Sequence, residues 1–453
     1  MSVDVKDATS TLADFIVHVR VPDAARARAA TAFRDTIGVI LAGVTEPAAR
    51  IAQSLAADEG RGECAVLGTG ISTSAGLAAL ANGVAAHALD FDDMCFVSLA
   101  HPSCALVPAS MAAGESVDVG TSALLDAYAI GFEIECRLGV VMNPRHYHER
   151  GWHCTSSIGT LGAAAAAARV FGLDATAARH ALGIAASSAC GVKENLGTMV
   201  KPLHAGLAAR NGLMAAQLAK HGFTASVHAL DGPQGYLAVM DSQHPSLDFA
   251  AVDLGVRWEI LETGVTVKLY PSCAATHPPL DVLLDIVRRE RFTHDQVAAI
   301  DVEVDSMTPR LLIHPSPTNG LEAKFSMPFC AAAAVVYGRI GVDTFDVAHI
   351  QDPPVQSLMR LVTLRANPAF DAAAPLSQAR VTVRLRDGRI FTQAADGARG
   401  YPGRLSDDEL ESKFIGCARR VLTDDATTRA WKALRDLEGA GDVRQLTRLF
   451  ASQ

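Results

Sequence analysis

The first 260 residues of the chain are rich in alanine, leucine and glycine, and their apolar side chains recur at every third or fourth position. Clear examples are residues 123–142, 156–173 and 204–223. Apolar residues at this spacing form one face of an α-helix, and so many small side chains favour helices that pack closely together. Because the segments share no fixed repeat length, a solenoid is not indicated. The pattern predicts a large bundle of packed helices.

The second half of the chain adds segments with a different periodicity. Residues 296–307 alternate between apolar and polar side chains, which is typical of a half-buried strand. Residues 378–393 read as two strands joined at Asp387 and Gly388, a residue pair that favours hairpin turns. Residues 323–338, which lie between these strands, have the pattern of a helix. Strands and helices together predict an α+β region.

These patterns divide a chain of 453 residues, which is too long for one ordinary core, into two predicted domains. We expect a large helical domain formed by residues 1–263 and 396–453, because the sequence becomes helical again after the last strand. We expect a smaller α+β domain over residues 264–395. The predicted fold class is therefore mainly α.

The overall composition excludes several classes of function. The formal charge of −9 argues against a nucleic-acid-binding surface. No apolar run reaches the 18 residues that a membrane span needs, and the first 20 residues lack the pattern of a signal peptide. The nine cysteines form no CxxC pair, so a disulfide framework or a structural zinc site is not indicated. We therefore expect a cytoplasmic protein.

Several basic residues stand where helices are expected to begin. His101, Lys201 and His277 each come directly before a proline that opens an apolar-periodic segment. Proline is favoured at the first position of a helix, and the residue before it is extended. His153 has a similar place before a helix expected to start near Ser156. These four cations are therefore predicted to lie at or near helix N-termini.

A helix N-terminus presents free N–H groups and a partial positive charge. A lysine or histidine at that end adds a cationic donor and makes a strong receptor for anions. If four such ends meet in space, they suit a substrate that carries several carboxylates.

The segment around "AHALDFDDMCF" poses the opposite problem, because it places acids in an apolar stretch. His87, Asp90 and Asp93 have helical spacing. Three interpretations remain open: a Mg²⁺ or Fe site, a magnesium diphosphate site, and acid–base chemistry in which Asp90 orients a histidine or lysine. The absence of a second acidic motif and the aromatic content of 6% disfavour the diphosphate site. Asp92 is expected to be a solvated acid near a helix end.

Several of these motifs, taken together and in order, resemble the MmgE/PrpD family. They cover most of the chain from about residue 80 to about residue 340. The segments that carry the resemblance are "HALDFDD" with the later "HPS", "GWHCTSSIGTLGAAAAAARVFGL", "GTMVKPLHAGLAARNGLMAAQLAKHGFTAS", "KLYPSCAATHPPLD" and "LEAKFSMPFCAAAAVVYG". The family contains 2-methylcitrate dehydratase, cis-aconitate decarboxylase and iminodisuccinate epimerase.

The resemblance implies a large helical domain, a smaller α+β lid domain and a homodimer, with no metal or organic cofactor. The motifs place the family's active-site residues on Asp90, His101, His153, Lys201 and His277. The sequences of the motifs are closest to those of the iminodisuccinate epimerase branch. The decarboxylase branch differs in having a threonine one helical turn after the first aspartate, where this chain has a methionine.

The reaction that unites these enzymes is proton transfer at a carbon next to a carboxylate of a small di- or tricarboxylate. Dehydration, epimerisation and decarboxylation all remain open. His101 or His153 is the expected base, Lys201 is expected to stabilise the developing anion, and His277 supplies a second group. The alternatives are a metal-dependent enzyme that uses the Asp-rich segment, and a non-catalytic helical dimer that binds carboxylates.

Overall fold

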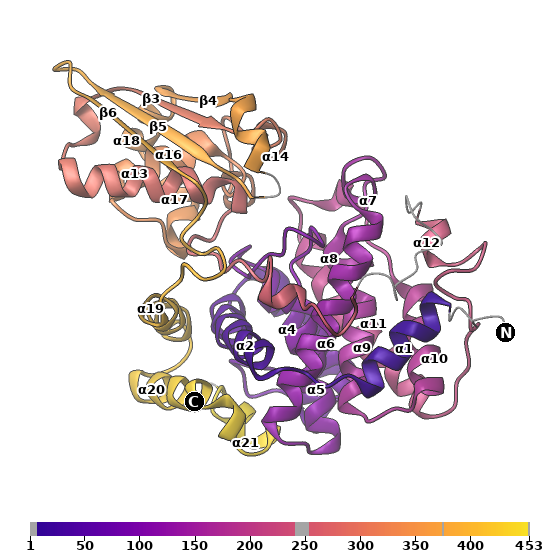
Figure 1. Ribbon diagram of the computed structural model, residues 1–453. Coiled ribbons are helices and arrows are strands. Elements are labelled where there is room, and N and C mark those ends of the chain that lie inside the picture. Colours follow the sequence, from indigo (N-terminus) through magenta and orange to yellow (C-terminus); the bar gives the residue numbers. More distant parts are fainter. Residues whose placement is uncertain (1–6, 241–252, 374–375, 452–453) are drawn as a thin grey trace. The chain divides into compact units, whose positions relative to one another are not determined.

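The structure is a computed structural model that describes residues 7–240, 253–373 and 376–451. Contacts within the chain separate it into two units. Figure 1 shows the chain coloured by residue number. The first unit is formed by the described parts of Met1–Ala88, Asp92–Thr266 and Ser406–Gln453, and the second by those of Leu89–Phe91 and Val267–Leu405. We propose that these units correspond to the two domains expected from the sequence.

The first unit consists almost entirely of helices. They are α1 (Ala8–His18), α2 (Asp23–Gly43), α3 (Pro47–Asp58), α4 (Ala75–His87), α5 (Ser103–Val117), α6 (Thr121–Met142), α7 (Arg145–His148), α8 (Cys154–Ser157), α9 (Gly159–Val170), α10 (Ala175–Ser188), α11 (Val200–Lys220), α12 (Tyr236–Val239), α19 (Asp407–Ala418), α20 (Asp424–Arg435) and α21 (Val443–Arg448). A short hairpin, β1 (Cys64–Ala65) and β2 (Ser72–Thr73), precedes α4. The three helical segments predicted from periodicity are confirmed as α6, α8 with α9, and α11.

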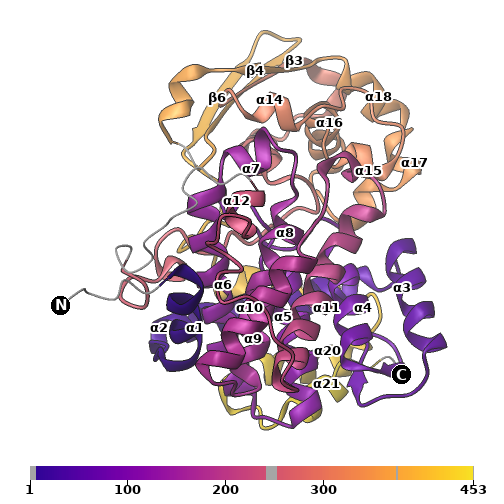
Figure 2. The same ribbon diagram turned by 90° about the vertical axis from the view of Figure 1, so that its right-hand side faces the viewer.

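Helix α11 packs against α4, α5 and α9, and Figure 2 shows it among these neighbours. Its crossing with α4 is unusually close because two glycines meet there. A Cβ atom on Gly83 of α4 would lie 2.8 Å from Gly206 Cα of α11, and one on Gly206 would meet the carbonyl oxygen of Leu80. Since neither position has room for a side chain, the two helix backbones touch directly. This contact fixes the C-terminal end of α4 against the N-terminal half of α11.

The second unit is a four-stranded sheet with helices, which confirms the predicted smaller α+β part of a mainly α fold. Its strands are β3 (Val297–Val304), β4 (Val362–Ala366), β5 (Ala379–Leu385) and β6 (Ile390–Ala395). Its helices are α13 (His277–Glu290), α14 (Thr308–Leu311), α15 (Gly320–Ala323), α16 (Met327–Tyr337), α17 (Val347–Ile350) and α18 (Pro353–Met359).

The sheet has the strand order β4-β3-β5-β6, with β4 parallel to β3 and the other pairs antiparallel. The predicted hairpin is confirmed, and Gly388 adopts the left-handed φ of +91° that its turn requires. Strand β4 was not predicted. It is an edge strand of five residues, in which half-buried Val362 and Leu364 alternate with exposed Thr363 and Arg365, and so short a run is ambiguous between helix and strand.

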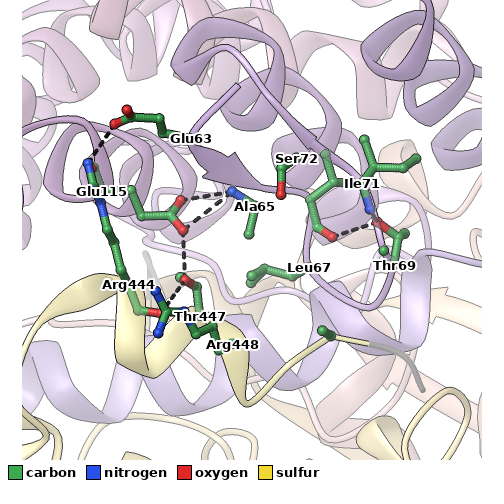
Figure 3. Close-up of a pocket in the computed structure, with 13 residues that line it drawn as sticks. Glu63, Ala65, Leu67, Thr69, Ile71, Ser72, Glu115, Arg444, Thr447 and Arg448 are labelled. Carbon is green, nitrogen blue, oxygen red and sulfur yellow. Dashed lines mark hydrogen bonds and ion pairs between the residues drawn. The ribbon is translucent and has the colours of Figure 1, made fainter. Parts of the chain in front are cut away.

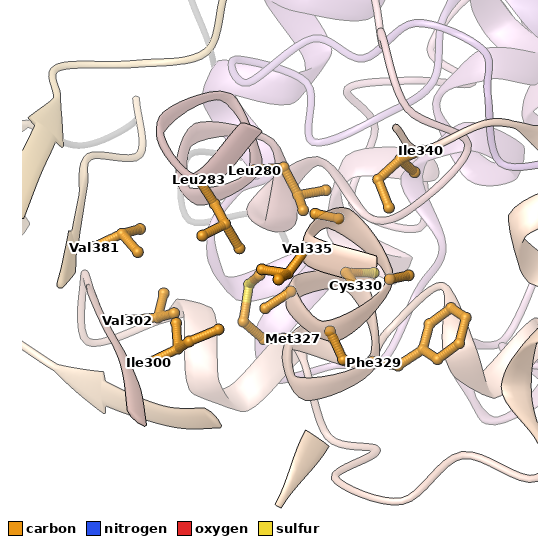
Figure 4. Packing of buried hydrophobic residues seen from close by; sticks show 14 of the residues in the cluster. Leu280, Leu283, Ile300, Val302, Met327, Phe329, Cys330, Val335, Ile340 and Val381 are labelled. Atoms are coloured by element: carbon orange, nitrogen blue, oxygen red, sulfur yellow. The ribbon is translucent and has the colours of Figure 1, made fainter. Parts of the chain in front are cut away.

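The core of the second unit lies between its sheet and helices α13 and α16. Ile300 and Val302 of β3 and Val381 of β5 belong to one buried apolar cluster with Leu283 of α13 and Met327 of α16 (Figure 4). Every second residue of a strand points to the same face, so β3 buries this face through alternate positions. The packing gives the second unit a core of its own.

None of the described helices combines the length and the apolar character needed to cross a bilayer.

Candidate active site

The three basic residues predicted at helix starts in the first unit, His101, His153 and Lys201, all lie at helix N-termini, which confirms that prediction. His101 stands directly before Pro102, the N-cap of α5. Lys201 is the second residue of α11. His153 is itself the N-cap of α8, so this helix begins two residues earlier than expected from the sequence. Proline and capping preferences therefore located these side chains along the chain.

The first unit brings these residues together in one buried group. The ring centroids of His87 and His101 lie 4.5 Å apart, those of His87 and His153 5.9 Å, and those of His153 and His204 5.2 Å. Lys201 is only 8% exposed, and its positive charge lowers the pKa of His87, His153 and His204. We call these five residues with Asp92 the histidine cluster.

Asp92 is the carboxylate of this cluster. His87 Nδ1 lies 2.7 Å from Asp92 Oδ2, and His101 Nδ1 lies 3.4 Å from the same oxygen. The prediction of a solvated Asp92 was wrong, since its exposed fraction is 0%. The expected helical continuation to Asp93 was also wrong, because α4 ends at His87 and Asp90 adopts a left-handed φ of +53°. The chain therefore turns away from the helix and returns Asp92 to the ring of His87.

Backbone hydrogen bonds hold the loops that carry the other two histidines. The backbone N–H of His153 donates to the carbonyl oxygen of Gly191 at 2.9 Å. The backbone N–H of His101 donates to Thr155 Oγ1 at 3.0 Å. The ring of His153 meets His204 of α11, with 3.0 Å between their Nδ1 atoms. His101, His153 and His204 are thus positioned by contacts between distant segments of the chain.

Burial sets the protonation states of the cluster. Burial, with the charges of Lys201 and His101, lowers the pKa of His87 to about 4 despite the neighbouring Asp92. Burial, followed by His87 and Lys201, holds the pKa of His153 well below its usual value. Burial would raise the pKa of Asp92, but His87 and His101 hold it well below its ordinary range. At neutral pH His87 and His153 are therefore neutral imidazoles, which can accept protons, and they lie beside the anionic carboxylate of Asp92.

Three members of the cluster also form a possible metal-binding group. One ligand atom from each of His87, Asp92 and His101 lies within 4.8 Å of the others. However, the distance of 2.7 Å between His87 and Asp92 is that of a charge-assisted hydrogen bond. A metal ion bound here would have to replace this hydrogen bond.

The second unit contains the other two predicted site residues. Lys268 Nζ donates to both Oδ1 and the backbone oxygen of Asp90, each at 2.9 Å, and both side chains are buried. His277 begins α13 as predicted, with its ring 5.1 Å from that of Tyr270. The assignment of Asp90 and His277 to the active site stays a prediction. Lys268, the ion-pair partner of Asp90, was not predicted.

A separate cavity of about 270 Å³ lies in the first unit between the β1–β2 hairpin, the end of α5 and helix α21. Figure 3 shows Glu115 there, accepting hydrogen bonds from the backbone N–H of Ala65 and from Thr447 Oγ1. Burial raises the pKa of Glu115 to about 7. Its lining, as far as the chain is described, includes none of the predicted site residues.

Sequence reasoning missed His204 and the pairing of His87 with Asp92. One signal for His204 was available, because it follows Lys201 by three residues and so lies on the same face of α11. No such signal existed for His87 and Asp92, whose contact depends on the turn at Asp90.

Comparison with known proteins finds two family domains along the chain. Residues 10–248 match the MmgE/PrpD N-terminal domain and residues 270–438 match the MmgE/PrpD C-terminal domain. Cis-aconitate decarboxylase of Mus musculus is 31% identical over 385 residues, which cover 82% of this chain and 78% of that protein. Cis-aconitate decarboxylase of Homo sapiens is 30% identical over 383 residues, covering 82% and 79%. Cis-aconitate decarboxylase-like protein oryM of Aspergillus oryzae is 28% identical over 418 residues, covering 87% and 86%.

These matches extend through both units, and the motifs around the histidine cluster lie within them. The chain belongs to the MmgE/PrpD family.

Proposed function

We propose that this chain is a lyase or isomerase that forms a carbanion next to a carboxylate of a small di- or tricarboxylate. The observation that carries the proposal is the histidine cluster: neutral, buried imidazoles stand beside Lys201, and Asp92 is anionic. The C–H group next to a carboxylate is a very weak acid. Removal of its proton therefore needs both a base and a fixed positive charge.

The roles follow from the chemistry of each group. The Lys201 ammonium binds a substrate carboxylate and stabilises the negative charge that develops on it. His153 or His101 exchanges a proton with the reacting carbon. Asp92, which accepts a hydrogen bond from His87, holds that ring in one orientation. Binding of a polyanionic substrate adds negative charge beside the imidazoles, which favours their protonated form and lets the same groups return a proton.

Decarboxylation of a tricarboxylate related to cis-aconitate is the first candidate reaction, because the relatives with that activity match more than four fifths of the chain. Epimerisation is the second candidate, because the motifs of this chain are most similar in sequence to those of the epimerase branch. Both reactions pass through a carbanion next to a carboxylate, and they differ in whether carbon dioxide leaves.

The test is NMR spectroscopy in D₂O with a panel of cis-aconitate, citrate, a methyl-substituted citrate and iminodisuccinate. Loss of carbon dioxide, loss of water, inversion or simple exchange of a C–H for a C–D each supports the carbanion chemistry and identifies the subtype. Binding by calorimetry without any deuterium incorporation would overturn it and would support the non-catalytic carboxylate-binding dimer.

The proposal includes the expectation that the enzyme needs no metal or organic cofactor. Activity that survives prolonged treatment with EDTA supports this part. Activity that disappears and returns on adding Mg²⁺ or Fe²⁺ would instead support a metal at His87, Asp92 and His101, whose ligand atoms are near enough to share one ion.

We also propose that the protein is a homodimer in the cytoplasm, as the resemblance to the family and the sequence composition imply. Light scattering during size-exclusion chromatography measures the assembly directly. A mass near 48 kDa, that of one chain, would contradict the dimer.

A further inference from the structure

The ring of His153 has one hydrogen-bond partner among the described residues, the ring of His204. Their Nδ1 atoms lie 3.0 Å apart, and both side chains are buried. Two neutral imidazoles that meet at Nδ1 share one hydrogen atom between them. The ring that donates it has a bare Nε2, and the ring that accepts it carries its own proton on Nε2.

Building on the proposed function, we infer that His204 is a positioning residue that holds His153 in the tautomer with its proton on Nδ1. In this tautomer the lone pair of His153 lies on Nε2, where it can accept a proton. His204 is then the neutral acceptor, with its proton on Nε2.

For the reactions that begin by breaking a C–H bond, epimerisation and dehydration, the proton step balances within this arrangement. His153 Nε2 takes the proton from the substrate carbon, and the electron pair of the broken C–H bond stays on that carbon beside its carboxylate. His153 becomes an imidazolium whose Nδ1–H donates more strongly to His204, so the positive charge is partly shared by both rings. The proton returns from Nε2 to the carbanion or to the leaving group when the product forms.

The surroundings of the pair keep both rings neutral, as a single shared hydrogen atom requires. His153 faces His87 from α4, His101 from the loop before α5, and Lys201 and His204 from α11. Burial and the nearby Lys201 lower the pKa of His204, so it remains neutral and is able to accept the hydrogen bond through Nδ1. Lys201 and His204 are three residues apart on one helix, which places the anion-binding group and the positioning group side by side.

Backbone contacts make the pairing rigid. The carbonyl oxygen of Gly191 fixes the backbone of His153, and Gly191 itself has a left-handed φ of +122°. A Cβ atom at Gly191 would lie 2.7 Å from Ser156 Cβ and 3.5 Å from His204 Cδ2. The loop therefore needs glycine to bring the two rings into contact.

The kinetic test compares His204→Ala with His204→Asn. Alanine removes the hydrogen bond, and we expect kcat to fall about 10²-fold while KM changes less than about 3-fold. Asparagine places a short polar group near the former Nδ1, so it should restore kcat to within about 10-fold of the wild type. His221→Ala, an exposed position at the C-terminal end of the same helix, is the control and should leave kcat unchanged.

The spectroscopic test does not depend on activity. In protein with ¹⁵N-labelled histidine, the wild-type His153 ring should carry its proton on Nδ1, and its signals are assigned by their loss in His153→Gln. His204→Ala should abolish this single tautomer, whereas His204→Asn should retain it. The tautomer of His153 is measured in the resting wild-type enzyme. This measurement therefore still tests the inference if the alanine variant fails to fold.

The outcomes separate this inference from the proposed function. A wild-type His153 with its proton on Nε2, or a folded His204→Ala enzyme with kcat within about 3-fold of the wild type, would overturn the positioning role. The expected tautomer in a protein that processes none of the polycarboxylates would contradict the proposed function and leave the assignment of His204 supported.

Discussion

His87 Nδ1 lies 2.7 Å from Asp92 Oδ2 in a place where neither side chain reaches solvent. They are five positions apart in sequence, and the chain between them leaves the helix through the left-handed Asp90. The pair fixes the ring of His87 and keeps a negative charge inside a group of otherwise neutral or positive side chains.

Asp92→Asn should lower kcat by about 10- to 100-fold, because the amide cannot hold the His87 ring by a charge-assisted hydrogen bond. Steady-state kinetics with the substrate found in the D₂O panel measures this effect. Asp118→Asn is the matched control, because Asp118 is exposed and has a left-handed φ of +55° that asparagine accepts well. Equal kcat in wild type and Asp92→Asn would exclude a role for this pair.

Lys201→Met keeps the length of the side chain and removes its charge. We expect kcat to fall by at least about 10²-fold, because the developing carboxylate charge loses its main donor. The pKa of His153 should rise, because Lys201 lowers it, so the acid limb of the pH–rate profile should move to higher pH. Lys220→Met, at the other end of α11, is the control and should alter neither quantity. An unchanged pH–rate profile in Lys201→Met would argue against the electrostatic effect of Lys201 on His153.

The sequence indicated several members of the histidine cluster but not the contacts between them. His101 and Lys201 were located because proline marks the start of a helix, a rule that acts within a few residues. The contact between His153 and His204 joins residues 51 positions apart, and no local preference encodes it. Strand β4 was missed for a related reason, since its parallel pairing with β3 depends on the intervening helices rather than on its own pattern.

His146→Gln tests how a buried neutral histidine outside the cluster makes the free energy of unfolding depend on pH. Burial lowers the pKa of His146 to about 4, and its Nε2 lies 2.8 Å from Ser157 Oγ. The unfolded chain binds this proton near pH 6.5, so the wild type loses stability as the pH falls from about 6.5 to about 4. Between pH 7.5 and pH 5 the variant should lose about 2 kcal/mol less than the wild type. Chemical denaturation at both pH values gives the difference, and parallel losses would refute the assignment.

Glu115→Gln should show the opposite dependence on pH. The folded-state pKa of Glu115 is about 7, above its ordinary value of 4.5, so the wild type loses stability as the pH rises from about 4.5 to about 7. Glutamine does not ionise. Relative to the wild type, the variant should therefore gain up to about 3 kcal/mol between pH 4.5 and pH 8. Urea titrations across this range provide the measurement, and a constant difference between the two proteins would rule the idea out.

Gly206→Ala should destabilise the protein by about 1–3 kcal/mol, because its methyl group would meet the backbone of α4. Activity should fall as well, since α4 carries His87 and α11 carries Lys201 and His204. Gly416→Ala in α19 is the control, because a Cβ atom there meets nothing within 4 Å. It should be neutral or stabilise the protein by up to about 1 kcal/mol. A Gly206→Ala protein with the melting temperature of the wild type would contradict the close crossing.

The crossing of Gly83 and Gly206 has a consequence for engineering the enzyme. Where two main chains touch, the spacing of α4 and α11 is set by van der Waals contact between their backbones, and there is no side chain to enlarge or trim. A library designed to accept bulkier acids should therefore leave both glycines untouched. It should vary instead the loops that lead into α5 and α11, where changes in length and shape do not alter the distance between the two helices.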